Sequence, residues 1–260
     1  MTTASHDPRP IGVFDSGIGG LTAVRELFRV LPGEGVIYFG DTARLPYGSK
    51  SSETVTRFSL EIARFLVKQD VKCIVVACNT SSSVALETLE RRLDIPVVGV
   101  IEPGAEAALA ASRHGRIGVI GTYGTVGSAA YTHAILRRRP DAAVIAHACP
   151  LFVPLVEEGW LDHPATRLVA ETYLRELWEH DIDTLVLGPG ITLIDSAAET
   201  ARAVARQLAD STLHAPRTAE AHVTFVVSDA PDQFKRVGKR FLGERVRDIE
   251  LVTLGGGEGR

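Results

Sequence analysis

The stretch IGVFDSGIGG at residues 11–20 sets the pattern of this chain: a short apolar run ends in a polar, glycine-rich loop that leads into a helical segment. A counterpart, IGVIGTYGTV, occupies residues 117–126 and also precedes a helical segment. A second pair follows at similar separations, because the apolar run 74–77 ends at Cys78 and the run 185–188 ends at Pro189. The sequence therefore predicts two α/β halves of related design, with a boundary near residues 98–103.

The whole chain alternates Val- and Ile-rich runs with amphipathic stretches, which is typical of parallel strands joined by crossover helices. Helices are predicted over residues 51–69 behind Ser51 as N-cap, from Ser196 with Glu199 in capping-box register, and near Asp229 with Pro231 in the first turn. Strands are predicted near residues 11–15, 36–40, 72–77, 96–101, 116–121, 143–147, 183–188, 191–195, 222–228 and 248–253. The predicted fold class is α/β, with two similar domains of mainly parallel sheets and the active site in the cleft between them.

Composition excludes several classes of function. The 260 residues include 28 basic and 32 acidic side chains, a net charge of −4 without a Lys/Arg block, so no nucleic-acid partner is expected. Apolar runs are far shorter than the roughly 18 residues that span a bilayer, and the polar segment 1–10 lacks the apolar core of a signal peptide. Three cysteines are too few for a disulfide framework, which favours the reducing cytoplasm.

The glycine-rich loops do not match a nucleotide-binding motif. Gly17, Gly19 and Thr22 lack the third glycine of G-x-G-x-x-G, residues 121–128 fit no better, and no G-K-[ST] phosphate loop is present. Neither HExxH nor a paired-cysteine ligand spacing occurs. We therefore expect no cofactor and no metal.

Cys78 is the strongest single candidate for a catalytic residue. It follows an apolar run and precedes Asn79, Thr80 and three serines, so it should lie where a strand gives way to a helix N-terminus. Unpaired amides and the helix dipole there favour an anion, which predicts a thiol pKa below its free value of about 8.5. The alternative from position alone is a small buried apolar side chain. Cys73, at the head of the same strand, is expected in the core.

Further polar residues follow other predicted strands. Asp15 and Ser16 come at the end of one, as do Asp41 and the Pro46-Tyr47-Gly48 turn, and together they would suit a zwitterionic substrate. The two aspartates could instead cap loops or helices. Glu157 and Glu158 follow the apolar segment 151–156, and either could face the cleft or face water.

Taken together, several ordered motifs make the chain resemble the glutamate racemases of the aspartate/glutamate racemase family. The motifs are FDSGIGGLT (14–22), GDTARLPYG (40–48), ACNTSS (77–82), PVVGVIEPG (96–104), GVIGTYGTV (118–126), ACPLFVPLVEEG (148–159) and VSDAPDQFKRVGKRFLG (227–243). The resemblance implies a cytoplasmic, cofactor-independent amino-acid racemase that supplies D-glutamate for peptidoglycan and is usually a homodimer. It also implies two domains, residues 1–98 with the returning 210–260, and residues 99–209.

The resemblance assigns roles to individual residues. In the family two cysteines on opposite sides of the substrate exchange the α-proton, and Cys78 matches the first of them. Asp15 and Glu157 match carboxylates that act with the thiol, and Asp41 matches a further supporting carboxylate at the substrate site. The other residues that match substrate-binding positions are Ser16, Tyr47, Gly48, Asn79, Thr80, Thr122 and Thr125. Hydrogen bonds to the substrate carboxylate and a dry cleft must stabilise the carbanion.

The second cysteine of the pair is missing. After DTLVLG (183–188) the family continues with a Cys-Thr-His motif and a helix, whereas this chain passes through Pro189-Gly190 to ITLIDSAAETA. We infer a deletion of roughly fifteen residues, about four helical turns of chain. Cys149 is not a substitute, because its ACPLFVP motif occurs in the family in addition to the pair. Only two residues separate the runs 183–188 and 191–195, which predicts a tight reversal or one bent segment rather than parallel neighbours.

Two hypotheses follow. The first is a glutamate racemase in which Cys78 is one acid/base. The second is a racemase-like protein that binds an acidic amino acid or a protein partner without racemising it. Within the enzyme class, a lone Cys78 could also exchange the α-proton of one enantiomer only. Aspartate racemases share the fold, and the glutamate motifs alone favour the longer substrate.

Overall fold

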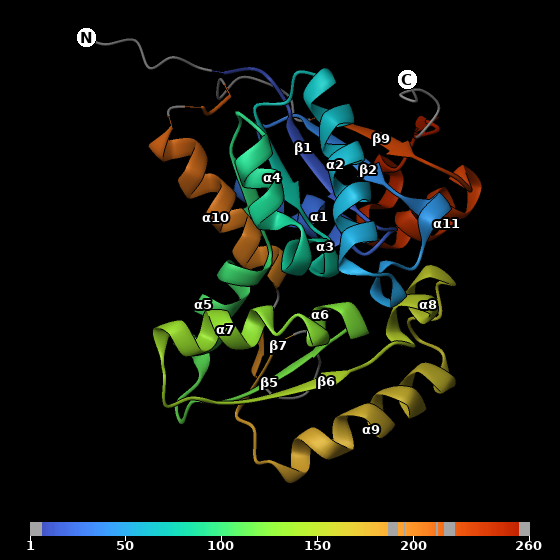
Figure 1. Ribbon diagram of the computed structural model, residues 1–260. Helices are drawn as coiled ribbons and strands as arrows, with labels where there is room; N and C mark the ends of the chain where they lie inside the picture. The colour runs from blue at the N-terminus through green and yellow to red at the C-terminus, as the bar shows by residue number, and fades with distance from the viewer. Residues whose placement is uncertain (1–6, 187–191, 195, 212, 216–221, 255–260) are drawn as a thin grey trace.

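The computed structural model describes residues 7–186, 192–194, 196–211, 213–215 and 222–254, which form two parallel β-sheets flanked by helices (Figure 1). The first sheet has the order β10-β9-β2-β1-β3-β4 and the second has the order β6-β5-β7-β8. The strands of the first sheet are β1 (Ile11–Asp15), β2 (Val36–Gly40), β3 (Cys73–Val76), β4 (Val97–Gly99), β9 (Val223–Val227) and β10 (Ile249–Leu251). Those of the second are β5 (Arg116–Gly121), β6 (Ala143–Ala148), β7 (Thr184–Val186) and β8 (Thr192–Ile194).

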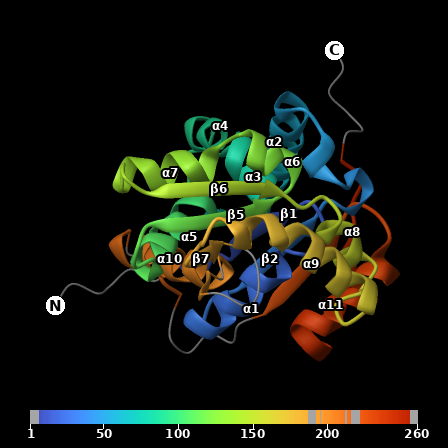
Figure 2. The same ribbon diagram turned by 90° about the horizontal axis from the view of Figure 1, so that it is seen from below.

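Helices cover both sheets. The α-helices are α1 (Leu21–Val30), α2 (Ser52–Lys68), α3 (Asn79–Val84), α4 (Leu86–Arg92), α5 (Ile101–Ala111), α6 (Tyr123–Gly127), α7 (Ala130–Arg138), α8 (Phe152–Glu157), α9 (Pro164–Glu179), α10 (Ser196–Asp210) and α11 (Pro231–Leu242). Short 3-10 turns are η1 (Thr42–Arg44), η2 (Tyr47–Ser49) and η3 (Gly243–Arg245). Helices α5, α6 and α7 lie between the second sheet and the first domain, and α9 lies on the far face, nearest the viewer in Figure 2.

The two sheets confirm the internal repeat. In the first, β1 lies between β2 and β3, with β4 beyond β3; in the second, β5 lies between β6 and β7, with β8 beyond β7. All of the strand pairs among the described residues are parallel. The predicted fold class, two similar α/β domains of mainly parallel strands, is therefore correct. The strand order reverses at β1 and at β5, because the strands that follow each of them lie on opposite sides of it. Ligands bind at such switch points.

The predicted helix starts are confirmed where the structure describes them. The Ser51 side chain accepts a hydrogen bond from the Thr54 amide at 3.2 Å, as an N-cap does, and Pro231 is the first residue of α11. In α2, Val55, Ile62 and Leu66 recur at helical spacing and are fully buried, because this stripe packs on the sheet.

One sequence prediction is wrong. The runs around β7 and β8 do not reverse; the two strands pair in parallel, with Thr184 opposite Thr192. Both strands are only three residues long, and β8 forms the edge of the second sheet beside β7. Pro189 and Gly190 lie outside the described residues.

Helix α10 connects the two parts of the molecule. It packs on α1, and its residues Ala197, Ala201, Val204 and Leu208 belong to the apolar core of the first sheet. The predicted boundary between residues 98 and 99 falls within β4. The division into residues 1–98 with 210–260 and residues 99–209 stays a prediction.

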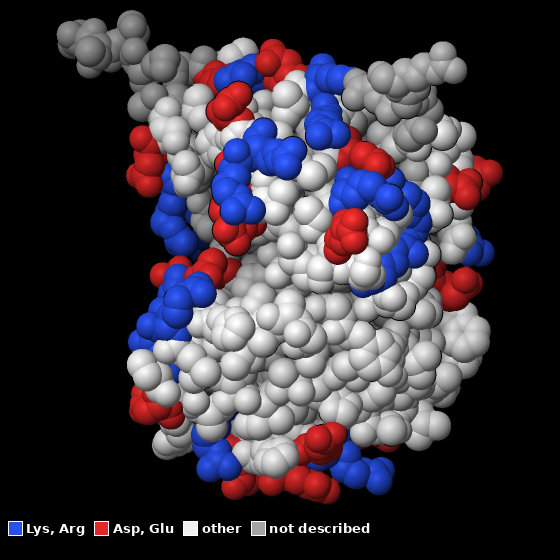
Figure 3. All heavy atoms as spheres, viewed as in Figure 1, with Lys and Arg blue, Asp and Glu red and all other residues white. Residues whose placement is uncertain are grey.

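The outer surface is mixed in charge. On the face drawn in Figure 3, acidic and basic side chains are interspersed over the first domain, and the middle of the second domain is mostly uncharged. Of the described helices, none combines the length and the apolar composition needed to cross a bilayer.

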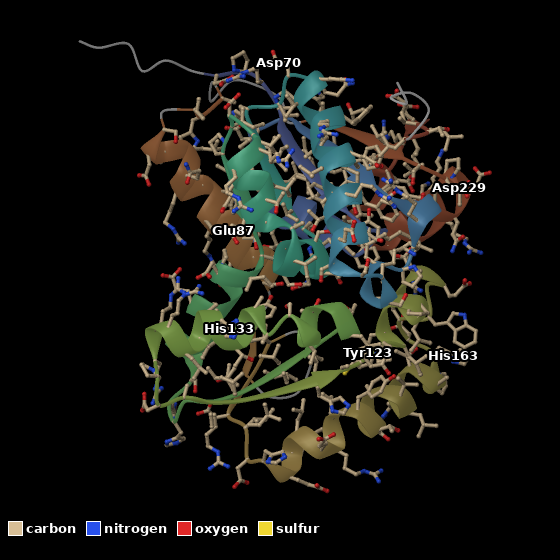
Figure 4. All side chains as sticks on the ribbon, viewed as in Figure 1. Asp70, Glu87, Tyr123, His133, His163 and Asp229 are labelled. Atoms are coloured by element: carbon tan, nitrogen blue, oxygen red, sulfur yellow. The ribbon has the colours of Figure 1, made fainter. Side chains whose placement is uncertain are left out.

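A buried ion pair fastens the end of the first sheet that is remote from the second domain. Lys72 and Glu34 form a salt bridge with side chains 0% and 3% exposed. The Lys72 ammonium also donates to the Asp7 carbonyl at 3.0 Å, and the Glu34 carboxylate accepts from the Ala215 amide at 2.7 Å. Asp70, two residues before Lys72, marks this end of the molecule in Figure 4. The pair therefore ties the N-terminal segment to the connection before β9.

Replacing Lys72 tests this anchor. Lys72→Ala leaves the Glu34 carboxylate buried without its cation, so we expect the free energy of unfolding to fall by about 3–5 kcal/mol. Lys68→Ala, four residues earlier on the exposed end of α2, should change it by no more than about 0.5 kcal/mol. Urea unfolding of both variants measures the difference, and similar losses for both would contradict the role of the buried pair.

Candidate active site

A cavity of about 490 Å³ lies between the two domains, at the carboxyl ends of the strands of both sheets. Asp15 and Ser16 follow β1, Cys78 begins α3 after β3, and Thr122 follows β5. The strand order reverses at β1 and at β5. The loops that follow these two strands, one in each repeat, therefore both border the cavity. The predicted cleft between two α/β halves is present, and seven of the predicted residues line it.

The predicted site residues fall into two groups. Those that line the cavity are Asp15, Ser16, Cys78, Asn79, Thr80, Thr122 and Glu157. Asp41, Tyr47, Gly48 and Thr125 are not among its lining residues, and they contact or support residues of the wall.

The Cys78 sulfur lines the cavity although the residue is only 4% exposed. Cys78 is the N-cap of α3, and its sulfur accepts a hydrogen bond from the Ser81 amide at 3.4 Å. The thiol also donates to the Ser16 hydroxyl, with a sulfur–oxygen distance of 3.7 Å. The predicted position at a strand-to-helix junction is correct. The alternative, a small buried apolar side chain, explains why Cys78 is buried but not why it lines the cavity.

The predicted lowering of the Cys78 pKa is wrong. Burial, and then the nearby Asp15 carboxylate, raise the pKa of the thiol above its ordinary value. The hydrogen bonds from Ser81 and Ser16 oppose this rise without overcoming it. A six-residue helix supplies few aligned amides, and desolvation of a thiolate outweighs them. Cys73 is fully buried in the apolar core, as predicted.

Asp15 serves the loop and the cavity at once. Its carboxylate accepts hydrogen bonds from the amides of Gly17 at 3.2 Å and Gly20 at 2.9 Å, so it caps the loop before α1. The same side chain lines the cavity and is 7% exposed. Burial raises the pKa of Asp15, while the loop amides act in the opposite direction.

Asp41 lies behind the cavity wall and supports it through hydrogen bonds. It is fully buried and accepts hydrogen bonds from the Tyr47 hydroxyl, the Arg44 guanidinium at 2.7 Å and the Ser228 hydroxyl at 2.8 Å. These donors come from η1, η2 and the end of β9. Asp41 therefore fixes the turn that carries Tyr47 and Gly48.

Of the two neighbouring glutamates, Glu157 faces the cavity and Glu158 is exposed. The Glu157 carboxylate reaches from the second domain to the first, where it accepts from the Ile18 amide at 2.9 Å. Burial raises the pKa of Glu157 to about 7, and the charge of Asp15 adds to this. The Gly17 position has no room for a side chain beside this carboxylate.

Three threonines join the domains on the other side of the cavity. The Thr80 hydroxyl lies 2.9 Å from that of Thr122 and 3.4 Å from that of Thr125, and the last two are 3.1 Å apart. Gly48 packs directly against Thr122. Helices α6 and α7, on which Figure 4 labels Tyr123 and His133, carry this side of the second domain.

Some residues of the site had no signal in the sequence. The Tyr131 hydroxyl of α7 donates to the Asn79 side-chain oxygen at 2.8 Å, and the Tyr38 hydroxyl of β2 donates to the Gly17 carbonyl at 2.8 Å. Both tyrosines occupy ordinary apolar positions of a helix and a strand. Cys149 also lines the cavity, and burial raises its pKa to about 12.

The rest of the cavity wall is apolar, with Ile120, Phe152, Val153 and Val156 from the second domain. Such a wall excludes water and strengthens the interactions of any charge inside. Among the described residues, no group of three or more His, Cys, Asp and Glu side chains is arranged to hold a metal ion.

The contact between Gly48 and Thr122 can be tested by adding one methyl group. A Cβ at Gly48 would lie 2.7 Å from the Thr122 methyl, whereas a Cβ at Gly127 meets nothing within 4 Å. We expect Gly48→Ala to lower the free energy of unfolding by about 1–3 kcal/mol through overpacking, and Gly127→Ala to stay within about 0.5 kcal/mol of the unchanged protein. Denaturant unfolding of both proteins gives the values; an undisturbed Gly48→Ala protein would rule out the tight contact between domains.

Comparison with known proteins agrees with the fold. Residues 11–215 match the family model of the Asp/Glu/Hydantoin racemases. A glutamate racemase of Geobacter metallireducens is 53% identical, over 95% of this chain and 97% of the relative. The crystal structure of glutamate racemase isoform RacE1 from Bacillus anthracis has a TM-score of 0.89 and 36% identity, covering 96% of this chain and 98% of that one. That of the Francisella tularensis glutamate racemase in complex with D-glutamate has a TM-score of 0.87 and 37% identity, covering 95% and 98%.

The G. metallireducens alignment also bears on the inferred deletion. It spans 262 positions, more than the 260 residues of this chain, although it covers only 95% of them. The relative therefore has residues without a counterpart here. The match of the family model and of these relatives nevertheless extends over most of the chain. The chain belongs to the Asp/Glu/Hydantoin racemase family.

Proposed function

We propose that this protein interconverts L- and D-glutamate by proton transfer at the α-carbon, without a cofactor, and that Cys78 is an acid/base of the reaction. The observation that carries the proposal is the position of Cys78 in the wall of the cavity between the two domains, beside the Asp15 carboxylate. The glutamate racemases among its relatives support the choice of substrate.

The cavity residues fit the parts of a glutamate zwitterion. The Asp15 carboxylate suits the ammonium group. Hydroxyl and amide groups of Ser16, Asn79, Thr80 and Thr122 suit its carboxylates. In our proposal the substrate site also includes four residues outside the cavity lining: Tyr47, Gly48, Asp41 and Thr125. Asp41 accepts a hydrogen bond from Tyr47, and the Thr125 hydroxyl lies within hydrogen-bond distance of Thr80, so these two position residues that touch substrate.

The proton transfer uses the thiolate form of Cys78. The sulfur forms a bond to the α-proton, the Cα–H bond breaks, and its electron pair moves onto the α-carbon and the adjoining carboxylate. Because burial disfavours the thiolate, the bound ammonium must supply a compensating positive charge. Donors aimed at the substrate carboxylate stabilise the negative charge that develops there.

Inversion requires a second acid/base on the opposite face. The repeat indicates where the family's second thiol belongs, because residues after β7 correspond to Cys78 after β3. This chain has no cysteine there; its other two are Cys73, in the core, and Cys149. This observation favours a second candidate function, in which the protein binds an acidic amino acid or a protein partner without racemising it.

We further propose the biological setting that the family resemblance implies. The protein would supply D-glutamate for peptidoglycan, act in the cytoplasm and form a homodimer. Cys73, Cys78 and Cys149 are all free thiols, as a reducing compartment would maintain them.

Exchange in deuterated water distinguishes the candidate functions. Each enantiomer of glutamate is incubated separately, and both deuterium at the α-carbon and optical rotation are followed. Rotation that decays to zero, with label incorporated, is the expected result for a racemase. Label without decay indicates exchange on one face only. The absence of both label and decay would contradict enzymatic activity and support binding alone.

The same assay tests the assignment of Cys78. Cys78→Ala should remove label incorporation, with a loss of at least about a hundredfold, because no other group in the described cavity replaces the base at that position. Cys73→Ala, which removes a thiol from the core of the first sheet, should retain most of the activity. Equal losses in the two variants would refute the assignment.

The pKa of Glu157 predicts how glutamate binding depends on pH. Glu157 is neutral below about pH 7 and charged above it, and glutamate carries a net charge of −1. Ionised Glu157 beside Asp15 repels this charge, so affinity should fall about fivefold or more as pH rises through 7. Glu157→Gln stays neutral and should abolish the fall.

Titration calorimetry with D-glutamate over a pH series measures this effect. Glu158→Gln is the matched control, because Glu158 is exposed and should leave the fall in place. If the fall persists in Glu157→Gln, or disappears in Glu158→Gln, Glu157 is not the group responsible.

A further inference from the structure

Ser81 differs from the two serines that follow it in α3. It is fully buried, and its hydroxyl oxygen has no hydrogen-bond partner among the described residues. By contrast, the Ser82 hydroxyl donates to the Val76 carbonyl at 2.8 Å, and the Ser83 hydroxyl donates to the Thr80 carbonyl at 2.8 Å. A buried hydroxyl without a partner destabilises a protein, so its presence calls for a functional reason.

The Ser81 side chain lies beside the Cys78 sulfur. Ser81 is the third residue of α3, and a side chain at this position points back toward the N-cap, which here is Cys78. Its amide already donates to the sulfur at 3.4 Å. Its side chain also lies close enough to the sulfur to favour the thiolate and so oppose the rise in pKa that burial causes.

Few other groups around the sulfur can donate to it. Asp15, Tyr38 and Tyr47 are the titratable groups that face it from β1, β2 and η2. The Tyr38 hydroxyl donates to the Gly17 carbonyl and the Tyr47 hydroxyl to Asp41, so their protons are committed elsewhere. The remaining hydroxyl donors beside the sulfur are those of Ser16 and Ser81.

We propose that Ser81 is a positioning residue whose hydroxyl donates a hydrogen bond to the Cys78 thiolate. In the thiol state the sulfur carries its own proton, and in this structure the Ser81 hydroxyl has no partner among the described residues. When the sulfur loses that proton it becomes a stronger acceptor, and the Ser81 hydroxyl joins the Ser81 amide in donating to it. The hydroxyl thus stabilises the state that takes the α-proton, which deepens the function proposed above and rests on it.

The reactivity of Cys78 toward iodoacetamide tests the inference without any enzymatic turnover. Alkylation consumes the thiolate, so its rate over a pH series reports the titration of the sulfur, and peptide mass spectrometry assigns the modification to Cys78. We expect Ser81→Ala to move the midpoint upward by about one pH unit, which lowers the alkylation rate below the midpoint about tenfold. The melting temperature of Ser81→Ala should equal or exceed that of the unchanged protein, because alanine removes a buried unpartnered hydroxyl from a helix.

Ser83→Ala is the matched control, since it removes a neighbouring hydroxyl that is bonded to a backbone carbonyl. It should leave the alkylation midpoint unchanged. An unchanged midpoint in Ser81→Ala, or an equal shift in Ser83→Ala, would overturn the inference. A shift confined to Ser81→Ala in a protein that fails to label glutamate would uphold it and refute the proposed function instead.

Discussion

The amides of the loop between β1 and α1 hold the two carboxylates around which the cavity is built. Gly17 and Gly20 donate to Asp15, and Ile18 donates to Glu157, which comes from the opposite domain. Backbone amides are fixed donors, so they keep both carboxylates in place without a cation beside them. The close approach requires glycine at position 17, where a side chain would collide with Glu157. The cleft, its polarity and its pKa values all depend on this loop.

The site combines burial with charge, and the two act against each other. Burial raises the pKa of Asp15, Glu157 and Cys78 at the same time. Ionised forms are therefore costly in the empty cavity, and an incoming ammonium group becomes a favourable partner for the Asp15 carboxylate and the Cys78 thiolate. The apolar wall of the second domain increases this effect because it keeps water away. The same burial therefore makes the Cys78 thiolate a stronger base and keeps water out of the cavity.

The second half of the molecule carries the same strand order as the first but not the same chemistry. Cys78 follows β3 directly, whereas the stretch after β7 contains no thiol. The sheet still forms, because β8 pairs with β7 as β4 pairs with β3. Strand pairing depends on short apolar runs, and these remain on both sides of the inferred deletion. The fold therefore forms without the second thiol, although racemisation requires a second acid/base.

The sequence by itself determined the strands, the repeat, and the positions of Asp15, Cys78 and Thr122 at strand ends, because these depend on local periodicity and on the rule that parallel strands direct their carboxyl ends to one edge. Only the tertiary structure decided which of Glu157 and Glu158 faces the cavity, and that Tyr131 supports Asn79. It also reversed the expected pKa shift of Cys78, since desolvation depends on every segment packed around the sulfur, whereas the helix dipole is local. Local order follows from neighbours in the chain, and electrostatics follows from neighbours in space.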